Sequence, residues 1–279
     1  MKRKDGNVMN VVRDRLDALR KLMKERGMDA YMIPTADFHE SEYVGEHFKC
    51  REYMTGFTGS AGTALITMDE ACLWVDGRYY VQAAAQLKDS TVTMMKMGQE
   101  GVPSLGAYLE DKMPEGGCLG FDGRERPELS AEPAWVLDER YAGKSALDKI
   151  ADVREAMEKA HASVHVLTSL DDIAWLLNIR GNDILYNPVV LSYALVTMDQ
   201  LYLFVNSSVL EGKAYPYLED AKGISVREYL ERTGVTVMPY DGVYDMVEGI
   251  KNEKVLLEKC RVNYAVYRLI DGSNKVIDR

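Results

Sequence analysis

The side chains that most resemble a metal site lie between His39 and Cys50. His39, His47 and Cys50 are three side chains of the types that zinc prefers as ligands. Their spacing fits no closed four-ligand pattern, however, and no fourth ligand lies at a matching spacing. His161 and His165 are four residues apart, which is a metal spacing on a helix. His165, however, falls inside an expected strand and would not share a face with His161. We therefore interpret His39 and His47 as polar loop histidines and predict no metal site.

A second candidate is the glycine-rich run Gly56–Gly62, which contains Ser60. The run lacks the Gly-x-Ser-x-Gly of a nucleophile elbow. No Gly-Lys-Ser/Thr follows it, and it precedes a hairpin rather than a helix, so it does not fit a phosphate loop. We predict a tight entry to a strand where only glycine fits, and no catalytic residue.

Carboxylates and amides gather in the second half of the chain. Asp171 and Asp172 are adjacent, and Asp172 is expected to cap a helical turn over 173–177. The loop Arg180-Gly-Asn-Asp-Ile-Leu-Tyr-Asn-Pro188 then collects an arginine, two asparagines, an aspartate and a tyrosine between apolar segments. Loops of this kind on a rigid scaffold often carry binding groups. Turn chemistry at its glycine, asparagines and proline explains the composition equally well, so both interpretations stand.

The elements that would position these residues repeat. Ala64-Leu-Ile-Thr-Met-Asp-Glu-Ala-Cys-Leu-Trp-Val-Asp76 returns as Ala194-Leu-Val-Thr-Met-Asp-Gln-Leu-Tyr-Leu-Phe-Val-Asn206, with seven of thirteen positions identical. Upstream, an amphipathic helix and an apolar strand recur at nearly the same offset, from Leu16 and from Ile150. Two matches in the same order predict an internal duplication of one α/β unit.

Each half is expected to hold a mixed sheet flanked by helices. Strands are expected at 29–34, 92–96, 118–121, 164–167, 235–238 and 254–258, with hairpins at 64–76 and 194–206. Helices are expected at 16–23, 79–87, 105–109, 145–160, 170–177, 226–231, 243–250 and 263–269, and no core element is expected after them. The predicted organisation is a first domain at 1–124, a linker at 125–145 and a second domain at 146–279.

Composition narrows the function classes. The 279 residues carry a net charge of −10 and no basic stripe, which argues against a nucleic-acid partner. No apolar run is long enough to span a membrane or serve as a signal peptide. The four cysteines are scattered, and Cys72 and Cys118 are expected to be buried thiols. Together these features predict a cytoplasmic protein.

Several strings resemble one family. They are His39-Glu-Ser-Glu-Tyr43, Gly56-Phe-Thr-Gly-Ser-Ala-Gly-Thr63, Trp74-Val-Asp-Gly-Arg-Tyr79, Asp172-Ile-Ala-Trp-Leu-Leu-Asn-Ile-Arg-Gly181, Tyr186-Asn-Pro-Val-Val-Leu-Ser-Tyr-Ala194 and Arg261-Val-Asn-Tyr-Ala-Val-Tyr-Arg268. Together they resemble the two N-terminal domains of the three-domain aminopeptidases P (Xaa-Pro aminopeptidases). The resemblance implies two tandem α/β domains of the creatinase/prolidase N-terminal type. It also implies a C-terminal pita-bread domain with two metal ions, usually manganese, and that domain is absent from this sequence.

The resemblance implies a non-catalytic part of a metallopeptidase that removes the residue before proline. Such a part shapes access of a proline-containing peptide and contributes to homodimer contacts. The alternative is a stand-alone peptide- or protein-binding module. The resemblance also implies that the region from Asp172 to Pro188 faces the catalytic cleft. The substrate-facing residues it implies are Asp172, Arg180, Asn182, Asp183, Tyr186 and Asn187.

One departure from the family lies in the first domain. The family usually has a further helix and strand between a segment like Gly120–Arg124 and one like Arg126–Ser130, and here these two segments abut. We therefore expect the sheet of the first domain to be shortened. A deletion, a truncated gene or a disordered stretch would each produce this junction.

Overall fold

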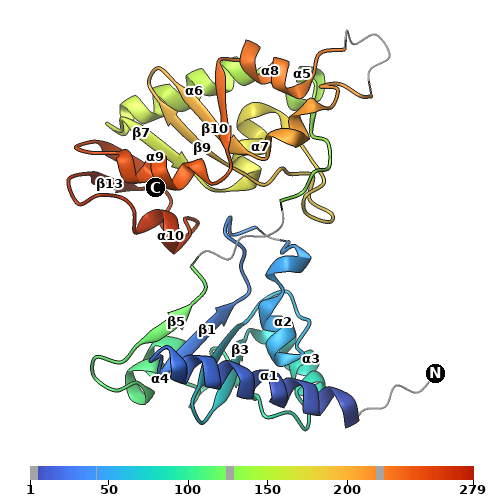
Figure 1. Ribbon diagram of the computed structural model, residues 1–279, viewed down its shortest axis with the longest axis vertical. Helices are drawn as coiled ribbons and strands as arrows, with labels where there is room; N and C mark the ends of the chain where they lie inside the picture. The colour runs from blue at the N-terminus through green and yellow to red at the C-terminus, as the bar shows by residue number, and fades with distance from the viewer. Residues whose placement is uncertain (1–5, 42, 124–128, 218–222) are drawn as a thin grey trace. The chain divides into compact units, whose positions relative to one another are not determined.

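The computed structural model describes residues 6–41, 43–123, 129–217 and 223–279. The chain divides into two compact units. Unit 1 comprises Met1–Thr35 and Glu46–Asp122, and unit 2 comprises Ala36–Gly45 and Gly123–Arg279 (Figure 1). The chain therefore enters unit 2 twice, first with the short inserted segment Ala36–Gly45 and later with the whole second half. Each unit is described by itself below.

Unit 1 is a five-stranded mixed sheet in the order β4-β3-β2-β1-β5. β1 pairs antiparallel with β2 and parallel with β5, while β3 pairs antiparallel with β2 and parallel with β4. The strands are β1 (Ala30–Pro34), β2 (Thr63–Thr67), β3 (Ala71–Val75), β4 (Thr93–Lys96) and β5 (Leu119–Phe121). The helices are α1 (Gly6–Glu25), α2 (Cys50–Thr55), α3 (Tyr80–Gln86) and α4 (Leu105–Lys112), with 3-10 turns η1 (Glu46–Phe48) and η2 (Gly77–Tyr79).

Helices cover both faces of this sheet. α1 buries Val12, Leu16 and Met23 on one face, in a cluster with residues of α2 and α3. On the other face Tyr108 of α4 packs in a separate cluster with Trp74. Successive residues of a strand contribute side chains to the two clusters in turn, because they point to opposite faces of the sheet.

Unit 2 is a six-stranded mixed sheet in the order β11-β10-β9-β7-β12-β13, accompanied by the two-stranded pair β6-β8. The strands are β6 (Trp135–Val136), β7 (Val164–Leu167), β8 (Ile179–Arg180), β9 (Ser192–Thr197), β10 (Leu201–Val205), β11 (Val235–Pro239), β12 (Lys254–Leu257) and β13 (Lys275–Asp278). The helices are α5 (Glu139–Ala142), α6 (Ala146–Lys159), α7 (Leu170–Leu177), α8 (Val226–Arg232), α9 (Gly242–Gly249) and α10 (Tyr264–Tyr267), with the 3-10 turn η3 (Ser207–Glu211).

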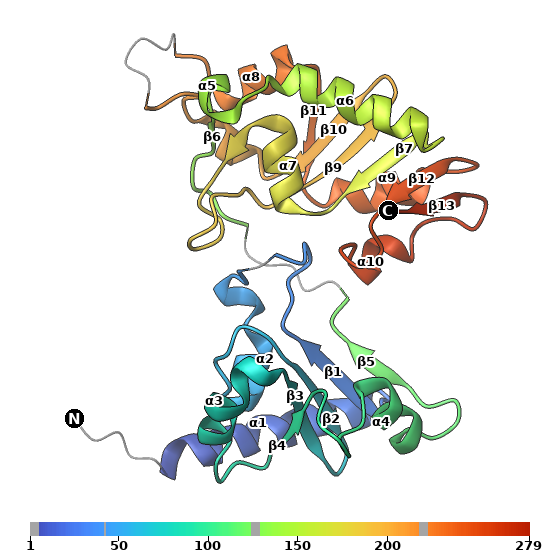
Figure 2. The ribbon, with the colours of Figure 1, turned by 180° about the vertical axis from the view of Figure 1, so that it is seen from behind.

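The sheet of unit 2 also separates two apolar clusters. α6 and α8 lie on one face, where Ala194 and Val196 of β9 point (Figure 2). α9 and α10 lie on the other, where Tyr193 and Leu195 point (Figure 1). α7 contributes Ile173 to the first cluster and other side chains to the second.

The predicted duplication is confirmed by the two sheets. The order β4-β3-β2-β1-β5 corresponds to β11-β10-β9-β7-β12, and every pair has the same direction in both units. Register also repeats, since Ala64 pairs with Leu73 and Ala194 with Leu203. A slip of one residue would turn each apolar set to the other face, so matching registers are strong support.

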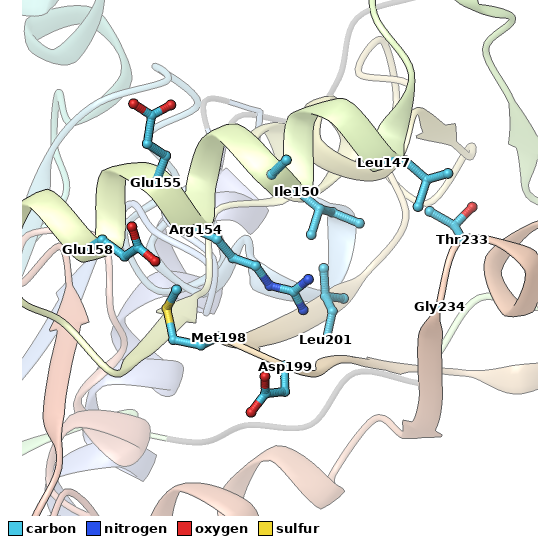
Figure 3. A pocket seen from close by; sticks show the side chains of 11 residues that line it. Leu147, Ile150, Arg154, Glu155, Glu158, Met198, Asp199, Leu201, Thr233 and Gly234 are labelled. Atoms are coloured by element: carbon cyan, nitrogen blue, oxygen red, sulfur yellow. The ribbon is translucent and has the colours of Figure 1, made fainter.

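A hydrogen bond repeats along with the strands. Arg20 Nε in α1 donates to the Thr67 carbonyl at 3.0 Å, and Arg154 Nε in α6 donates to the Thr197 carbonyl at 3.0 Å. Both arginines thus bond to the last residue of a β-strand, at the hairpin turn. Figure 3 shows Arg154 extending from α6 towards this turn, over a hollow of about 480 Å³.

Several sequence-based expectations need correction. β13 is a sixth strand close to the end of this sequence, where no core element was expected. β6 and β8 were also missed, because two-residue strands leave no period to detect. From Ala134 onward the expected linker is packed on unit 2, with Ala134 donating its N–H to Val209 at 2.8 Å. Cys72 is buried as predicted, but Cys118 is exposed.

The junction expected to carry a deletion, residues 124–126, lies outside the described residues. The two sheets still differ beside it. β12 pairs with β13 on its outer side, whereas β5, the corresponding strand of unit 1, has no outer partner among the described residues. Unit 1 therefore has the shorter sheet.

Candidate functional site

The candidate site begins with α7, which carries the adjacent carboxylates. Ser169, not Asp172, is its N-cap, because the Ser169 hydroxyl accepts the Asp172 N–H at 3.4 Å and the helix starts at Leu170. The capping role expected for Asp172 is therefore wrong. Its side chain is exposed and makes no side-chain hydrogen bond or ion pair with a described residue, so its carboxylate is available to a ligand.

The opposite end of α7 is held by two cations. Arg180 Nη1 donates to the carbonyls of Ala174 at 2.6 Å and Ile179 at 2.8 Å. Lys149 Nζ donates to the Trp175 carbonyl at 2.9 Å and to Asn178 Oδ1 at 2.6 Å. These contacts satisfy carbonyls that a helix C-terminus leaves without partners, and positive charge there is favoured by the helix dipole.

The burial of these two cations differs in degree. Lys149 is 2% exposed and Arg180 is half-buried, and burial lowers the pKa of both. Sequence reasoning missed Lys149. The only feature of the sequence that indicated its burial was its position three residues after Ala146, on the apolar side of α6. The Nη1 of Arg180 is committed to structure, while its Nε and Nη2 make no hydrogen bond to a described residue.

The loop after β8 divides into anchored and exposed residues. Asp183 Oδ2 accepts the Leu191 N–H at 2.7 Å, its Oδ1 is buried without a partner, and burial raises the pKa of this carboxyl. Asn187 Nδ2 donates to Asp171 Oδ1 at 3.4 Å. Asn182 is exposed, and Tyr186 is 85% exposed at a left-handed φ of 68°. Of the six residues that the resemblance implies, Asp183 thus faces inward, whereas Asn182 and Tyr186 are exposed.

The sequence did not predict that one histidine is buried within unit 2 and hydrogen-bonded on both of its ring nitrogens. His39, on the inserted segment, is 1% exposed. Its Nδ1 lies 2.7 Å from the Thr168 carbonyl and its Nε2 lies 2.8 Å from the Tyr240 hydroxyl. A carbonyl only accepts, so Nδ1 carries the proton and Nε2 accepts from Tyr240. The polar-loop interpretation is thus wrong for His39, while His47 is exposed as expected.

The same segment is held together by internal hydrogen bonds of Asp37 and is anchored at one further point, through Asn263. Asp37 Oδ1 accepts the N–H of His39 at 2.9 Å and that of Ser41 at 3.0 Å. Asn263 Nδ2 donates to the Phe38 carbonyl at 3.1 Å and to the Tyr193 hydroxyl at 3.0 Å. The inserted segment is therefore an integral part of unit 2.

The glycine-rich run has the structural role that was predicted. A Cβ on Gly59 would lie 2.2 Å from the Phe57 ring, and Gly62 has a φ of +154° with the Trp74 carbonyl 3.0 Å from the site of a Cβ. Buried Arg51 also lies against this run and donates to the Gly59 carbonyl.

Neither a metal site nor a membrane segment emerges from the described part of the chain. Its residues contain no group of three or more His, Cys, Asp or Glu side chains placed to hold a metal ion. None of its helices combines the length and apolar character that crossing a bilayer requires. The residues in hand therefore do not fit a two-metal centre, and no catalytic step is assigned to them.

Family comparisons decide what this scaffold is. Residues 15–137 match one model described as the creatinase/prolidase N-terminal domain, and residues 125–279 match a second with the same description. The chain belongs to the creatinase/prolidase N-terminal domain family. The second match spans more than half of the sequence, and the duplicated topology explains why two such domains occur in tandem.

Relatives extend the comparison over nearly the whole chain. A probable Xaa-Pro aminopeptidase P of Sordaria macrospora is 37% identical over 275 residues, covering 86% of this chain and 43% of the relative. Aminopeptidase P2 of Arabidopsis thaliana is 31% identical over 92% of this chain and 40% of the relative. A solved X-prolyl aminopeptidase of Caenorhabditis elegans, described as a cytosolic enzyme with a di-nuclear active site, matches with a TM-score of 0.84 and 28% identity over 96% of this chain and 50% of that one.

Two features of these alignments bear on domain organisation. This creatinase/prolidase N-terminal pair spans half or less of each of these three relatives. The alignment with the Sordaria protein also runs over 275 residues, although it covers only 86% of the 279 residues of this chain. That difference arises where a relative carries residues that this chain lacks.

Proposed function

We propose that this chain is the non-catalytic N-terminal part of an Xaa-Pro aminopeptidase-like metallopeptidase. The full-length enzyme would release the N-terminal residue that precedes proline. The observation that carries the proposal is the match over 96% of this chain to half of the C. elegans X-prolyl aminopeptidase. In this proposal units 1 and 2, as described above, are the two N-terminal domains. The two divalent metal ions, manganese by our expectation, bind ligands outside this sequence.

Within that enzyme, the segment from Asp172 to Asn187 would face the peptide substrate. Asn182 and Tyr186 support this role best, because their side chains are exposed and unused by the fold. Arg180 retains Nε and Nη2 for a substrate carbonyl or carboxylate, a geometry that suits the guanidinium fork. Asp183 would act by holding the loop through Leu191. Cytoplasmic location and homodimer formation belong to the same proposal.

One assay tests the non-catalytic role. The purified 279-residue chain is incubated with an Arg-Pro-Pro peptide, with and without manganese, and release of the first residue is measured. A two-metal hydrolase holds its ions about 3.5–4 Å apart with several ligands, and the described residues provide no such group. We expect no turnover in either condition. Manganese-dependent release by the chain alone would overturn the proposal.

A second candidate function is a stand-alone peptide- or protein-binding module. The observation that favours it is the exposed tip of the loop after β8, where Leu185 is 68% and Tyr186 85% exposed. Two adjacent exposed apolar side chains at a loop tip could insert into an apolar site of a partner, and larger exposed apolar patches mark interaction sites. If this candidate holds, Tyr186→Ser should abolish binding to an Xaa-Pro peptide column, while Tyr264→Ser, at an exposed tyrosine of α10, should not.

A further inference from the structure

A second pocket of unit 2, of about 270 Å³, lies where three parallel strands end. β7 pairs parallel with β12, and β12 pairs parallel with β13. The residues that follow these strands, Thr168, Glu258 and Arg279, all line the pocket. In open α/β sheets ligands bind outside the carboxyl ends of parallel strands, so this pocket occupies a location typical of a ligand site.

The pocket contains a hydrogen-bond acceptor of fixed orientation. His165 of β7 donates from Nδ1 to the Leu256 carbonyl at 3.0 Å, which leaves Nε2 without a partner among the described residues. Burial lowers the pKa of this imidazole, although nearby Asp172 acts in the opposite direction. At neutral pH the ring is therefore uncharged and Nε2 accepts. Beside it stands the carboxylate of Asp172, which also lines the pocket.

The remaining walls supply a cation and an apolar surface. Arg261 Nε pairs with Glu258 Oε2 at 3.1 Å, and its Nη1 and Nη2 make no hydrogen bond to a described residue. Val153 and Leu176 line the pocket together with Trp175, which is 48% exposed. The lining thus combines three groups that can accept from a cation (His165 Nε2 and the carboxylates of Asp172 and Glu258), the guanidinium groups of Arg261 and Arg279, and an apolar floor.

From these groups we infer that the pocket binds a small zwitterion, an α-amino acid or dipeptide with an apolar side chain. Its ammonium group donates to the Asp172 carboxylate and His165 Nε2, its carboxylate meets Arg261, and its side chain lies on Val153, Leu176 and Trp175. The volume falls just below the range of about 300–1,000 Å³ that holds drug-sized ligands, which suits a smaller molecule. An amino acid released by the proposed peptidase is of this class, but the inference rests on the pocket alone.

The test uses the full chain with ¹⁵N-labelled tryptophan and L-leucine as the probe. Of the three indole N–H signals, that of Trp175 is assigned with Trp175→Phe and followed through the titration. We expect a saturable shift with a Kd on the order of millimolar, as befits so few ligand atoms. Two matched probes, leucine amide and 4-methylpentanoate, each lack one charge and should bind about ten-fold more weakly, because each loses a charge-assisted contact.

Variants assign the contacts. Asp172→Asn should weaken leucine binding about ten-fold while leaving 4-methylpentanoate unchanged, and Arg261→Met should weaken leucine while leaving leucine amide unchanged. Asp199→Asn, in the hollow of Figure 3, is the control and should change nothing. The inference is overturned if Trp175 shows no saturable shift, if all three probes bind equally, or if the two variants bind leucine like the parent protein. None of these outcomes depends on peptidase activity.

Discussion

Replacing His39 by alanine should destabilise unit 2 by about 3–5 kcal/mol. The change leaves the Thr168 carbonyl and the Tyr240 hydroxyl buried without their partner, and each such group costs about 1–3 kcal/mol. It also empties the space of a ring whose centroid lies 4.5 Å from that of Tyr193, which adds a cavity cost. His39→Asn should cost less, about 1–3 kcal/mol, because its amide can still donate to Thr168.

The assay is urea unfolding followed by tryptophan fluorescence. Trp74 reports on unit 1, whereas Trp135 and Trp175 report on unit 2. In a Trp74→Phe background the fluorescence transition therefore belongs to unit 2 alone. The matched control is His47→Ala, an exposed histidine whose loss should cost less than about 0.5 kcal/mol. If His39→Ala unfolds at the same urea concentration as His47→Ala, the inserted segment does not hold unit 2 as the contacts indicate.

The same histidine predicts a pH dependence. Burial lowers the pKa of His39 below the ordinary 6.5, while Asp37 and the Thr168 carbonyl oppose this shift. Tyr240 and Tyr193 are the other titratable groups packed against it. The unfolded chain then binds the proton more readily, so this contribution is complete above pH 6.5 and is lost as pH falls towards the folded-state pKa. Between pH 7.5 and 5.5, the parent should lose more stability than His39→Asn. Because His165 shifts in the same direction, the difference between the two proteins isolates His39.

Three further predictions test separate parts of the account. Arg154→Met removes the hydrogen bond to Thr197 and should lower the free energy of unfolding by about 0.5–1.5 kcal/mol, measured in urea; an unchanged midpoint would show that the repeated hydrogen bond carries no stability. Gly181→Ala would place a Cβ 2.7 Å from Val190 Cγ2 and 2.9 Å from the Val189 carbonyl oxygen, and it should lower the free energy of unfolding by about 1–3 kcal/mol. Gly106→Ala, in open space within α4, should instead raise the free energy of unfolding by about 0.5–1 kcal/mol. Equal thermal midpoints for the two variants would contradict the packing argument. Arg180→Lys should lower the free energy of unfolding by about 1 kcal/mol, because the shorter lysine side chain does not bring its ammonium group to the position of Nη1, which donates to two carbonyls. Calorimetry that finds no loss would leave Arg180 free for a purely substrate-facing role.

The duplicated core could be predicted because its signal is local and repeated. Apolar alternation fixes β2 and β3 as a hairpin, and the offset of 130 residues carries the same pattern to β9 and β10. β13 escaped prediction because its four residues, Lys-Val-Ile-Asp, place two adjacent apolar side chains between two charged ones and show no strand alternation. The pairing of β6 with β8 depends on contacts between residues more than 40 positions apart, which no local pattern encodes.

The candidate site was less predictable, since its partners are distant in sequence. The loop after β8 could be identified from its polar composition, but composition did not distinguish inward Asp183 from outward Asn182. His39 was taken for a polar loop residue because Thr168 and Tyr240, which satisfy it, lie 129 and 201 positions away. Lys149 was overlooked for the same reason, because a lysine is rarely buried unless distant carbonyls accept from it.

A hybrid enzyme tests the central claim most directly. This chain replaces the matching half of the C. elegans X-prolyl aminopeptidase, and manganese-dependent release of arginine from Arg-Pro-Pro is measured. If the chain is the non-catalytic N-terminal part of such a peptidase, the hybrid should turn over while the chain alone does not. Tyr186→Ala should then reduce kcat/KM of the hybrid, and Tyr264→Ala should not. A folded, metal-loaded hybrid without peptidase activity would contradict the account.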